Sequence, residues 1–310
     1  MWDFDASGTP HLLRPDYFAQ FAGKPVNFTQ DYYRVFNNRF SEAIREVHPE
    51  AFIFIENIHE EPPYQPGETD AKGIVYAPHW YDAYVLVKKE YSPFIGVNSL
   101  SHKPVFSAPA IRQSFYDQLA TLNGYAEHNL GGVPFVLGEF GISFDLSEKR
   151  AYRTGDFRLQ AKALQRSLQA VEYNLFNYTL WNYTPDNTNL HGDLWNDEDL
   201  SIYSRDQQTN PRDINSGGRA LEAVVRPYPL ATSGELLEAA FNPYKQLFKL
   251  KFRHDPAILA PTEVFVPNFH YPHGYSVKVS DGRVEIKRSQ QTLLYWPSSK
   301  QSVHKLTIKP

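Results

Sequence analysis

The chain has 310 residues, 42% of them hydrophobic, which is enough for one large or two ordinary domains with a sizeable core. Its net charge of −4 excludes a strongly basic nucleic-acid binder, and the absence of cysteine excludes disulfides and thiolate metal sites. No apolar run reaches the ~18 residues of a membrane span, and the residues after Met1 lack the basic-then-apolar pattern of a signal peptide.

The first quarter of the sequence predicts a turn-rich start, one helix and two strands. Residues 1–27 are rich in proline and glycine and show no strand signal. From Thr29, a plausible N-cap, to His48, apolar residues recur every three or four positions and predict an amphipathic helix. The apolar runs 51–55 and 73–77 predict buried strands. The apolar stripe of the helix consists of Tyr33, Phe36, Phe40, Ile44 and Val47.

The middle of the chain alternates helices and strands. The predicted elements are, in order, a helix marked by apolar residues between 111 and 122 that stops at Gly131-Gly132, a strand over 133–139, a helix from Asp156 to Leu175, a strand over 176–183 and a short helix over 219–225. This alternation predicts parallel βα units. The unbroken apolar runs indicate a sheet that is covered on both faces.

The pattern changes after Arg226-Pro227-Tyr228-Pro229 to short segments of period two. These predict a small antiparallel β-sandwich, so that residues 1–227 and 228–310 form two domains. Asp281-Gly282 predicts a hairpin turn between two of the strands. The predicted strands are 247–252, 262–266, 275–279, 284–287 and 306–308. Tyr271, Tyr275, Tyr295 and Trp296 are predicted core residues, with contact to a membrane surface or ligand as the alternative.

Polar and aromatic side chains follow the predicted parallel strands, at the edge where α/β barrels carry out their chemistry. They are Glu56-Asn57, His79-Trp80-Tyr81, Glu139 and Trp181-Asn182-Tyr183. An ionised Glu139 can attack the anomeric centre of a sugar, and the Trp181 indole can stack on a pyranose face. His79 and Tyr81 can orient the carboxylate by hydrogen bonds. Taken singly, each residue has a structural alternative; four successive strand ends of this kind favour a site.

These residues carry a family resemblance. The segment Val136-Leu137-Gly138-Glu139-Phe140-Gly141 resembles the nucleophile strand of clan A glycoside hydrolases of family 5. His79-Trp80-Tyr81 resembles that family's His-x-Tyr after the sixth strand, and Trp181 matches the aromatic residue after the eighth. Residues 191–202 and 219–229, with the appended β-sandwich, resemble the endoglycoceramidase and fungal glucosylceramidase-like subfamily.

The resemblance implies a fold and an activity. The fold is α/β, a partial (β/α)8 TIM barrel of strands five to eight followed by the β-sandwich. The activity is that of a retaining β-glycosidase on glucosylated lipids such as glucosylceramide or steryl glucoside. Glu139 would be the nucleophile, His79 and Tyr81 would line the reactive sugar subsite, and Trp181 would be its platform. The predicted contacts to glucose hydroxyls are Asn187, Asn189, Asp193, Trp195 and Asn196, with an Asn/Asp-rich turn network as the alternative.

One catalytic group is missing from this set. A retaining glycosidase needs two carboxyls about 5–5.5 Å apart. The resemblance places the general acid in an Asn-Glu-Pro motif after the fourth strand, and this motif does not occur in the sequence. We therefore expect the C-terminal part of an enzyme, beginning just beyond its general acid, poorly soluble and inactive alone. Replacement of the acid by Glu56, Glu60 or Glu61 is disfavoured, because Glu56 ends a strand that resembles the fifth.

Two other functions remain open. One is a β-glucanase or mannanase of the same family that acts on polysaccharide; the other is a non-catalytic sugar- or lipid-binding protein. A metal hydrolase is disfavoured because no His-x-His or His-Glu-x-x-His spacing occurs, and no cofactor is expected. The expected partner is a glycoside or glycolipid substrate, with peripheral membrane contact as an option and without nucleic acid or an obligate protein partner. The lack of cysteine is more typical of an intracellular protein, but the sequence leaves the compartment undecided.

Overall fold

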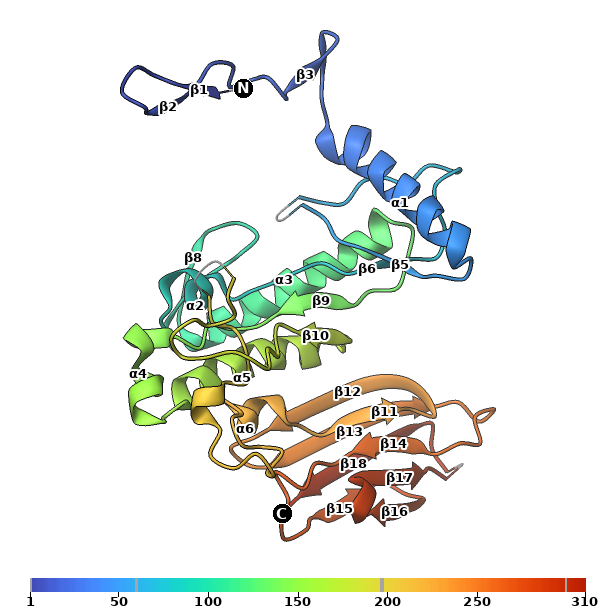
Figure 1. The fold of residues 1–310 in the computed structure, drawn as a ribbon. Coiled ribbons are helices and arrows are strands. Elements are labelled where there is room, and N and C mark those ends of the chain that lie inside the picture. Colours follow the sequence, from blue (N-terminus) through green and yellow to red (C-terminus); the bar gives the residue numbers. More distant parts are fainter. Residues whose placement is uncertain (1, 59–60, 196–197, 299) are drawn as a thin grey trace. The chain divides into compact units, whose positions relative to one another are not determined.

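The computed structural model describes residues 2–58, 61–195, 198–298 and 300–310 (Figure 1). The chain divides into two compact units. The first comprises Met1–Pro78 and Asn123–Phe135, and the second comprises His79–Leu122 and Val136–Pro310.

The first unit begins with two short antiparallel hairpins where the sequence predicts no strands. They are β1 (Trp2–Phe4) with β2 (Pro10–Leu12), and β3 (Gln20–Phe21) with β4 (Lys24–Pro25). The first turn is held by Asp5, whose Oδ1 accepts the backbone N–H groups of Ser7 and Thr9 at 2.8 and 2.9 Å. The expectation of a strand-free start is therefore wrong, because local turn contacts close these hairpins without an apolar strand pattern.

The predicted helix over 29–48 is confirmed, but it does not bury its whole apolar stripe. A π-helical turn, η1 (Thr29–Tyr33), leads into α1 (Arg34–Val47). Asn37 and Ser41 are the buried residues of α1, whereas Phe36 and Phe40 are 58% and 46% exposed. The Ser41 hydroxyl donates to the Asn37 carbonyl at 2.7 Å, so this polar residue is satisfied within the helix. The buried face of α1 therefore consists of small polar residues, which allow close packing, whereas the rings of Phe36 and Phe40 remain exposed to solvent.

Two parallel strands form the centre of the first unit. β5 (Ile53–Ile55) pairs in register with β6 (Ile74–Tyr76), and Tyr76 bridges in parallel to Phe135. All of β6 is buried, whereas β5 exposes Phe54 between two buried isoleucines. Both predicted strands are confirmed, although only one face of β5 is covered. The buried core of this unit consists of Ile53, Ile55, Tyr64, Ile74, Tyr76, Ala126 and Leu130.

The second unit contains the other α/β elements, and α3 belongs to both units. In chain order they are α2 (Ala83–Lys88), β7 (Ile95–Val97), β8 (Pro104–Phe106), α3 (Ala108–His128), β9 (Leu137–Phe140), α4 (Leu146–Thr154), α5 (Arg158–Tyr173), β10 (Tyr178–Leu180), η2 (Arg205–Gln207) and α6 (Leu221–Val224). β9 and β10 pair in parallel, as the alternating pattern predicts. The helices α3, α5 and α6 are confirmed, while α2, α4 and the antiparallel β7–β8 hairpin lie in stretches for which the sequence predicted no element.

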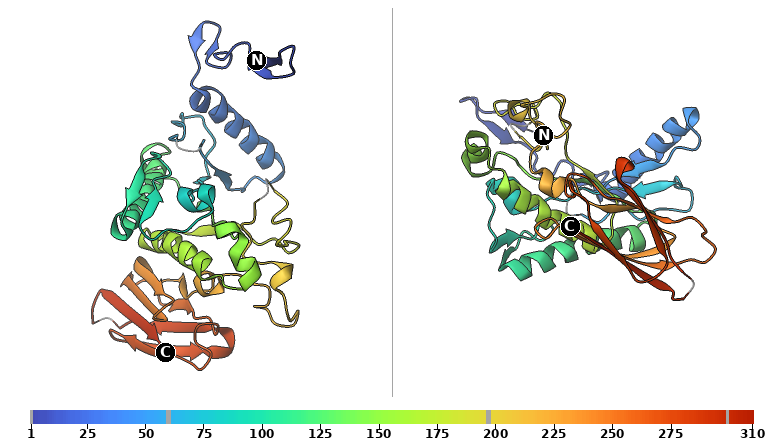
Figure 2. Two further views of the ribbon diagram at one scale, coloured as in Figure 1. Left: turned by 90° about the vertical axis from the view of Figure 1, so that its left-hand side faces the viewer. Right: turned by 90° about the horizontal axis from the view of Figure 1, so that it is seen from below.

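The C-terminal region of the second unit is a β-sandwich, as predicted. One sheet has the order β11 (Tyr228–Ala231), β14 (Thr262–Phe265), β17 (Thr292–Trp296), β16 (Arg283–Lys287). The other has the order β12 (Gly234–Asn242), β13 (Leu247–His254), β18 (Val303–Lys309), β15 (Ser276–Val279). The short turn η3 (Arg288–Gln290) precedes β17. Figure 2 shows the strands of the sandwich from two further sides. Tyr271 and Tyr295 are buried in the core between the sheets, which agrees with their predicted core role.

Asp281-Gly282 does not form the predicted hairpin. Gly282 has a positive φ of 75°, so the turn is present, but β15 before it pairs with β18 and β16 after it pairs with β17. The turn therefore carries the chain from one sheet of the sandwich to the other. Asp281 accepts hydrogen bonds from Tyr295 and Ser298 at 3.0 and 2.7 Å and contacts the buried His304. These contacts, which join residues distant in sequence, decide the pairing.

The sandwich is joined to the α/β part of the same unit by a buried ion pair. The Arg226 guanidinium donates from Nε and Nη2 to one carboxylate oxygen of Glu172 on α5, at 2.8 and 2.7 Å. The backbone N–H of Phe241, on β12, donates to the other oxygen of Glu172 at 3.2 Å. This arrangement fixes α5 against β12. Within the described residues, no helix is both long and apolar enough to cross a membrane.

Candidate active site

Three neighbouring chain segments of the second unit bring the predicted site residues together. His79 bridges in parallel to Glu139 on β9, and the Trp80 N–H donates to the Glu139 carbonyl at 2.9 Å. Trp181 directly follows β10, and its N–H donates to the carbonyl of Phe140 at 2.8 Å. The backbone ladder thus places segment 79–81, Glu139 and Trp181 side by side at their carboxyl ends.

Gly141 makes this close arrangement possible. A Cβ atom at this position would lie 2.1 Å from the Trp181 carbonyl oxygen, far inside contact distance. The glycine after Glu139-Phe140 is therefore required by the backbone that carries Trp181. The peptide bond between Trp181 and Asn182 is cis.

The two carboxylate oxygens of Glu139 face different partners. The Tyr81 hydroxyl donates to Oε1, and His79 Nδ1 lies 3.6 Å from Oε2. Burial raises the pKa of Tyr81 far above its ordinary value, and the hydrogen bond to Glu139 raises it further. Tyr81 therefore remains a protonated donor across the physiological pH range. These contacts hold the Glu139 carboxylate in one orientation, as a nucleophile requires.

Glu139 lines a hollow of about 680 Å³. This volume falls in the range of small-molecule pockets. Trp181 and Trp195 border it and are 40% and 63% exposed, so both indoles are accessible to a ligand. The other lining residues are His79, Tyr81, Leu86, Asn182, Tyr183, Thr184, Asp193, Glu198 and Leu200.

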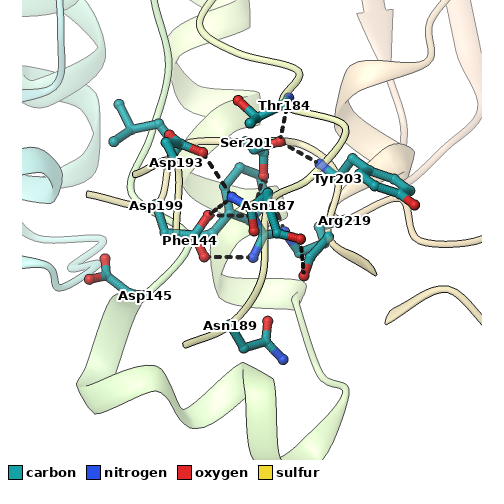
Figure 3. A network of polar contacts seen from close by, with 12 residues as sticks. Phe144, Asp145, Thr184, Asn187, Asn189, Asp193, Asp199, Ser201, Tyr203 and Arg219 are labelled. Atoms are coloured by element: carbon teal, nitrogen blue, oxygen red, sulfur yellow. Dashed lines mark hydrogen bonds and ion pairs between the residues drawn. The ribbon is translucent and has the colours of Figure 1, made fainter. Parts of the chain in front are cut away.

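A buried polar network supports the loop that follows β10 (Figure 3). Arg219, fully buried, donates to both oxygens of Asp199, from Nη1 at 2.9 Å and from Nη2 at 2.5 Å. The Asn187 amide donates to Oδ1 of Asp199 and to Oδ1 of Asp193, each at 2.8 Å. Oδ2 of Asp193 in turn accepts the Asn182 amide at 3.1 Å. The network therefore extends from a buried guanidinium to the residue after Trp181.

The predicted hydroxyl-binding residues occupy different environments. Trp195 and Asp193 line the pocket, but Asn187 is fully buried and its amide hydrogens are taken up by the two aspartates. The Asn189 N–H donates to Asp206 at 2.6 Å, and its side-chain Oδ1 is buried without a partner among the described residues. Asn196 lies outside the described residues.

The carboxyls considered as a replacement acid belong to the first unit. The Glu56 carbonyl accepts the Tyr33 hydroxyl at 2.8 Å, and the Glu61 carboxylate accepts the Thr29 hydroxyl at 3.0 Å. Glu60 lies outside the described residues. Among the residues that the structure describes, no cluster of three His, Asp or Glu side chains is arranged to hold a metal ion.

The sequence assigned no role to one pocket carboxylate, Glu198, nor to the lining residues Leu86, Thr184 and Leu200. Glu198 lies within the stretch 191–202 that carries the family resemblance. Its position in that stretch was the available signal, but its neighbours in sequence are acidic too, and only the folded loop separates the buried Asp199 from the pocket-lining Glu198.

Comparisons with known proteins identify the family of the chain. Residues 23–187 match the cellulase model of glycosyl hydrolase family 5, and residues 226–308 match the C-terminal domain model of glycoside hydrolase family 5. The first match covers more than half of the chain.

Curated relatives and a solved structure extend the likeness over nearly the whole chain. A glucosylceramidase of Rhizopus delemar is 29% identical over 95% of this chain and 47% of its own length, and one of Aspergillus fumigatus is 31% identical over 89% and 46%. The crystal structure of Cryptococcus neoformans sterylglucosidase 1 superposes with a TM-score of 0.87 at 30% identity, covering 98% of this chain and 48% of that one. The chain spans about half the length of the curated relatives it matches.

Proposed function

The chain belongs to glycoside hydrolase family 5, and from this premise we propose that it carries the nucleophile side of a retaining β-glycosidase site for glucosylated lipids. The observation that supports this is the Glu139 carboxylate, held by Tyr81 and facing His79 in a pocket bordered by the indole of Trp181. The class of substrate is inferred from relatives that are glucosylceramidases and a sterylglucosidase.

In the proposed reaction, Glu139 attacks the anomeric carbon of the sugar as an ionised carboxylate. The new bond joins a Glu139 oxygen to the anomeric carbon, the glycosidic C–O bond breaks, and the leaving oxygen takes up a proton. Water then attacks the anomeric carbon and gives up one proton, the bond between that carbon and the Glu139 oxygen breaks, and the sugar and the free carboxylate are released. Tyr81 keeps its proton throughout and orients Oε1, because burial and the neighbouring carboxylate hold its pKa far above neutrality.

In our proposal, this chain does not supply the proton donor for the leaving oxygen. The Asn-Glu-Pro motif that the family resemblance predicts is absent from the 310 residues. We therefore expect the polypeptide, taken by itself, to bind a glucoside but not to turn over a substrate whose leaving group needs protonation.

The remaining pocket residues have a binding role in the proposal. Trp181 and Trp195 offer apolar faces to the sugar ring, and Asp193 and His79 offer polar atoms at the pocket wall. Asn187 contributes by fixing Asp193, since its amide is bonded to that carboxylate. Direct hydroxyl contacts by Asn189 and Asn196 stay predictions.

We further propose that β5, β6, β9 and β10 correspond to strands five to eight of a TIM barrel. In support, β5 pairs with β6 and β9 with β10 in parallel, and site residues follow the carboxyl ends. The division at 227/228 into a barrel part and a sandwich is proposed on the same basis.

Covalent trapping tests the nucleophile without the missing proton donor. We expect 2-deoxy-2-fluoro-β-glucosyl fluoride to label the purified 310-residue chain once, at Glu139, because fluoride leaves without protonation and the fluorine slows release of the sugar. Intact-mass spectrometry and peptide mapping measure this. Glu139→Gln should abolish the label, whereas Glu238→Gln, an exposed carboxylate on β12, should keep it.

The same material tests the absence of turnover with octyl β-glucoside, because an alkoxide leaving group needs a proton whereas a nitrophenolate does not. Release of glucose by the chain that disappears in Glu139→Gln would contradict our expectation that these 310 residues alone do not turn over such a substrate, but it would support the role of Glu139. No labelling of a folded chain at any reagent concentration would refute the proposed function and favour a non-catalytic protein. Equal labelling by cellobiosyl and glucosyl reagents would favour the polysaccharide alternative.

A further inference from the structure

The pocket contains a second carboxylate that the proposed displacement does not use. Glu198 lines the same hollow as Glu139, Tyr81 and Trp195. The pKa of Tyr81 is raised mainly by burial and by the contact with Glu139, and the negative charge of Glu198 raises it further. The pKa of Glu198 itself is raised, mainly by burial. The positive charge of Lys89 lowers this pKa, whereas the negative charges of Asp193 and Glu139 raise it. The two carboxylates therefore act on one another across one small space.

The backbone of Glu198 is held in place on both sides. Its carbonyl accepts the Asp193 N–H at 2.9 Å, and its own N–H donates to the Trp195 carbonyl at 2.9 Å. Gly192, with a φ of 56°, passes so close that a Cβ there would lie 2.1 Å from the Glu198 carbonyl oxygen. The next residue is Asp199, which the buried Arg219 clamps. Backbone hydrogen bonds thus anchor Glu198 on both sides, which reduces the entropy lost when it binds a ligand.

The carboxylate of Glu198 differs from the other two of this loop in its partners. Asp193 accepts hydrogen bonds from Asn182 and Asn187, and Asp199 accepts them from Arg219. Within the part of the chain that the structure describes, no residue donates a hydrogen bond to the Glu198 carboxylate. The nearby cation Lys89 is bonded to Asp145 instead, at 2.6 Å. A half-buried carboxylate on a fixed backbone, with its acceptor sites open, is suited to bind a ligand that brings donors.

We propose that Glu198 is a specificity-determining residue, whose carboxylate accepts hydrogen bonds from two adjacent hydroxyls of the bound sugar. The inference rests on the proposed function, because it takes the pocket around Glu139 to be a sugar site. The two oxygens of a carboxylate match two equatorial hydroxyls on neighbouring ring carbons, and Trp195, which lines the same pocket, offers its indole to the ring. A sugar in which one of the two hydroxyls is axial fits this pair poorly, so Glu198 selects the configuration of the ring.

Calorimetric titration with methyl β-glucoside and its monodeoxy analogues tests the assignment. We expect Glu198→Gln to weaken binding of the parent glucoside about tenfold or more, since a hydrogen bond to a charged group is replaced by one to a neutral amide. The two monodeoxy analogues that each lack one of these hydroxyls should bind the unmodified chain more weakly than the parent, and Glu198→Gln should weaken them less than it weakens the parent glucoside. Glu238→Gln on β12 is the matched control and should bind every ligand like the unmodified chain.

The outcomes separate the two proposals. If Glu139 is labelled but Glu198→Gln binds the parent glucoside as tightly as the unmodified chain, only the role of Glu198 is overturned. The same holds if the variant keeps its affinity and loses labelling alone, because Glu198 would then serve the chemistry and not recognition. The analogue series on the unmodified chain tests the assignment even if the variant misfolds: uniform affinity for all monodeoxy sugars refutes it. Failure of the unmodified chain both to bind and to be labelled overturns both proposals.

Discussion

At the residue scale, the acidic side chains in and next to the pocket differ in the groups that surround them. Glu139 contacts a phenol and an imidazole, Asp199 is neutralised by a buried guanidinium, and Glu198 faces the pocket without a described donor. The Glu139 and Tyr81 positions could be predicted because Glu139 ends one apolar strand pattern and Tyr81 lies a few residues after another. The environment of Asp199 could not, since its partner Arg219 lies twenty positions further along the chain.

Asp70, in the first unit, gives a pH-dependent prediction. Its carboxylate accepts Arg34 Nε and Nη2 at 2.6 and 2.9 Å, and this pairing is the main cause that holds its pKa below the usual value. Because the folded pKa is depressed, the stabilisation is complete above the unfolded pKa of about 3.9 and is lost as the pH falls through the folded pKa. We expect Asp70→Asn to lower the free energy of unfolding by about 1–2 kcal/mol at pH 7, since the Arg34 side chain is partly exposed.

Urea unfolding followed by circular dichroism between pH 7 and pH 2.5 measures this effect. The difference between the original chain and Asp70→Asn should shrink below about pH 4. Asp16→Asn, at an exposed aspartate, is the control and should leave the free energy of unfolding unchanged at every pH. A difference of the same size at pH 7 and pH 2.5 would contradict the assignment.

At the element scale, short parallel strands define the site and longer helices hold it. β9 has four residues and β10 three, and segment 79–81 is fixed by Trp80, which is fully buried. The Trp80 indole N–H donates to Gln118 on α3 at 3.1 Å. Helices such as α3 and α5 could be predicted because their apolar residues recur with helical spacing. The six-residue α2 has too few turns to show a period, and Asp82 caps it only in the folded chain.

Gln118→Met tests the support that α3 gives to the site. Gln118 Oε1 accepts Trp80 Nε1 and both the N–H and hydroxyl of Ser99. Removal of this buried acceptor should lower the free energy of unfolding by about 2–3 kcal/mol, because three donors lose their partner. Labelling at Glu139 should slow as well, since Trp80 separates His79 from Tyr81. Gln113→Met, on an exposed face of the same helix, is the control for helix propensity. Equal stability of the two variants would argue against this support.

At the scale of the whole molecule, the described chain leaves large apolar side chains uncovered. In the first unit, Phe52 and Phe54 at β5 are 70% and 60% exposed, and the aromatic stripe of α1 is exposed next to polar positions. Exposed apolar side chains and an open strand edge promote association. This agrees with the expectation from the sequence that the chain alone is poorly soluble, which stays a prediction.

Replacement of these two phenylalanines tests the origin of that association. We expect Phe52→Ser with Phe54→Ser to raise the soluble concentration several-fold and to shift the sedimentation profile towards monomer, because the largest exposed side chains of β5 are removed. Ile214→Ser, at a loop residue that is 97% exposed, should change neither quantity. Association that is unaffected by the double change would place its cause elsewhere on the surface.

The sequence by itself determined the longer helices and the parallel strands that alternate with them, the change from α/β to antiparallel β near residue 227, and the segments that carry Glu139, His79, Tyr81 and Trp181. These features follow from local steric periods and from residues close together in the chain. Only the tertiary structure decided that Asp281-Gly282 joins two sheets, that Arg219 clamps Asp199, and that Glu198 enters the pocket. Such pairings depend on contacts between residues far apart in sequence, and the local sequence pattern does not predict which distant residue will be the partner.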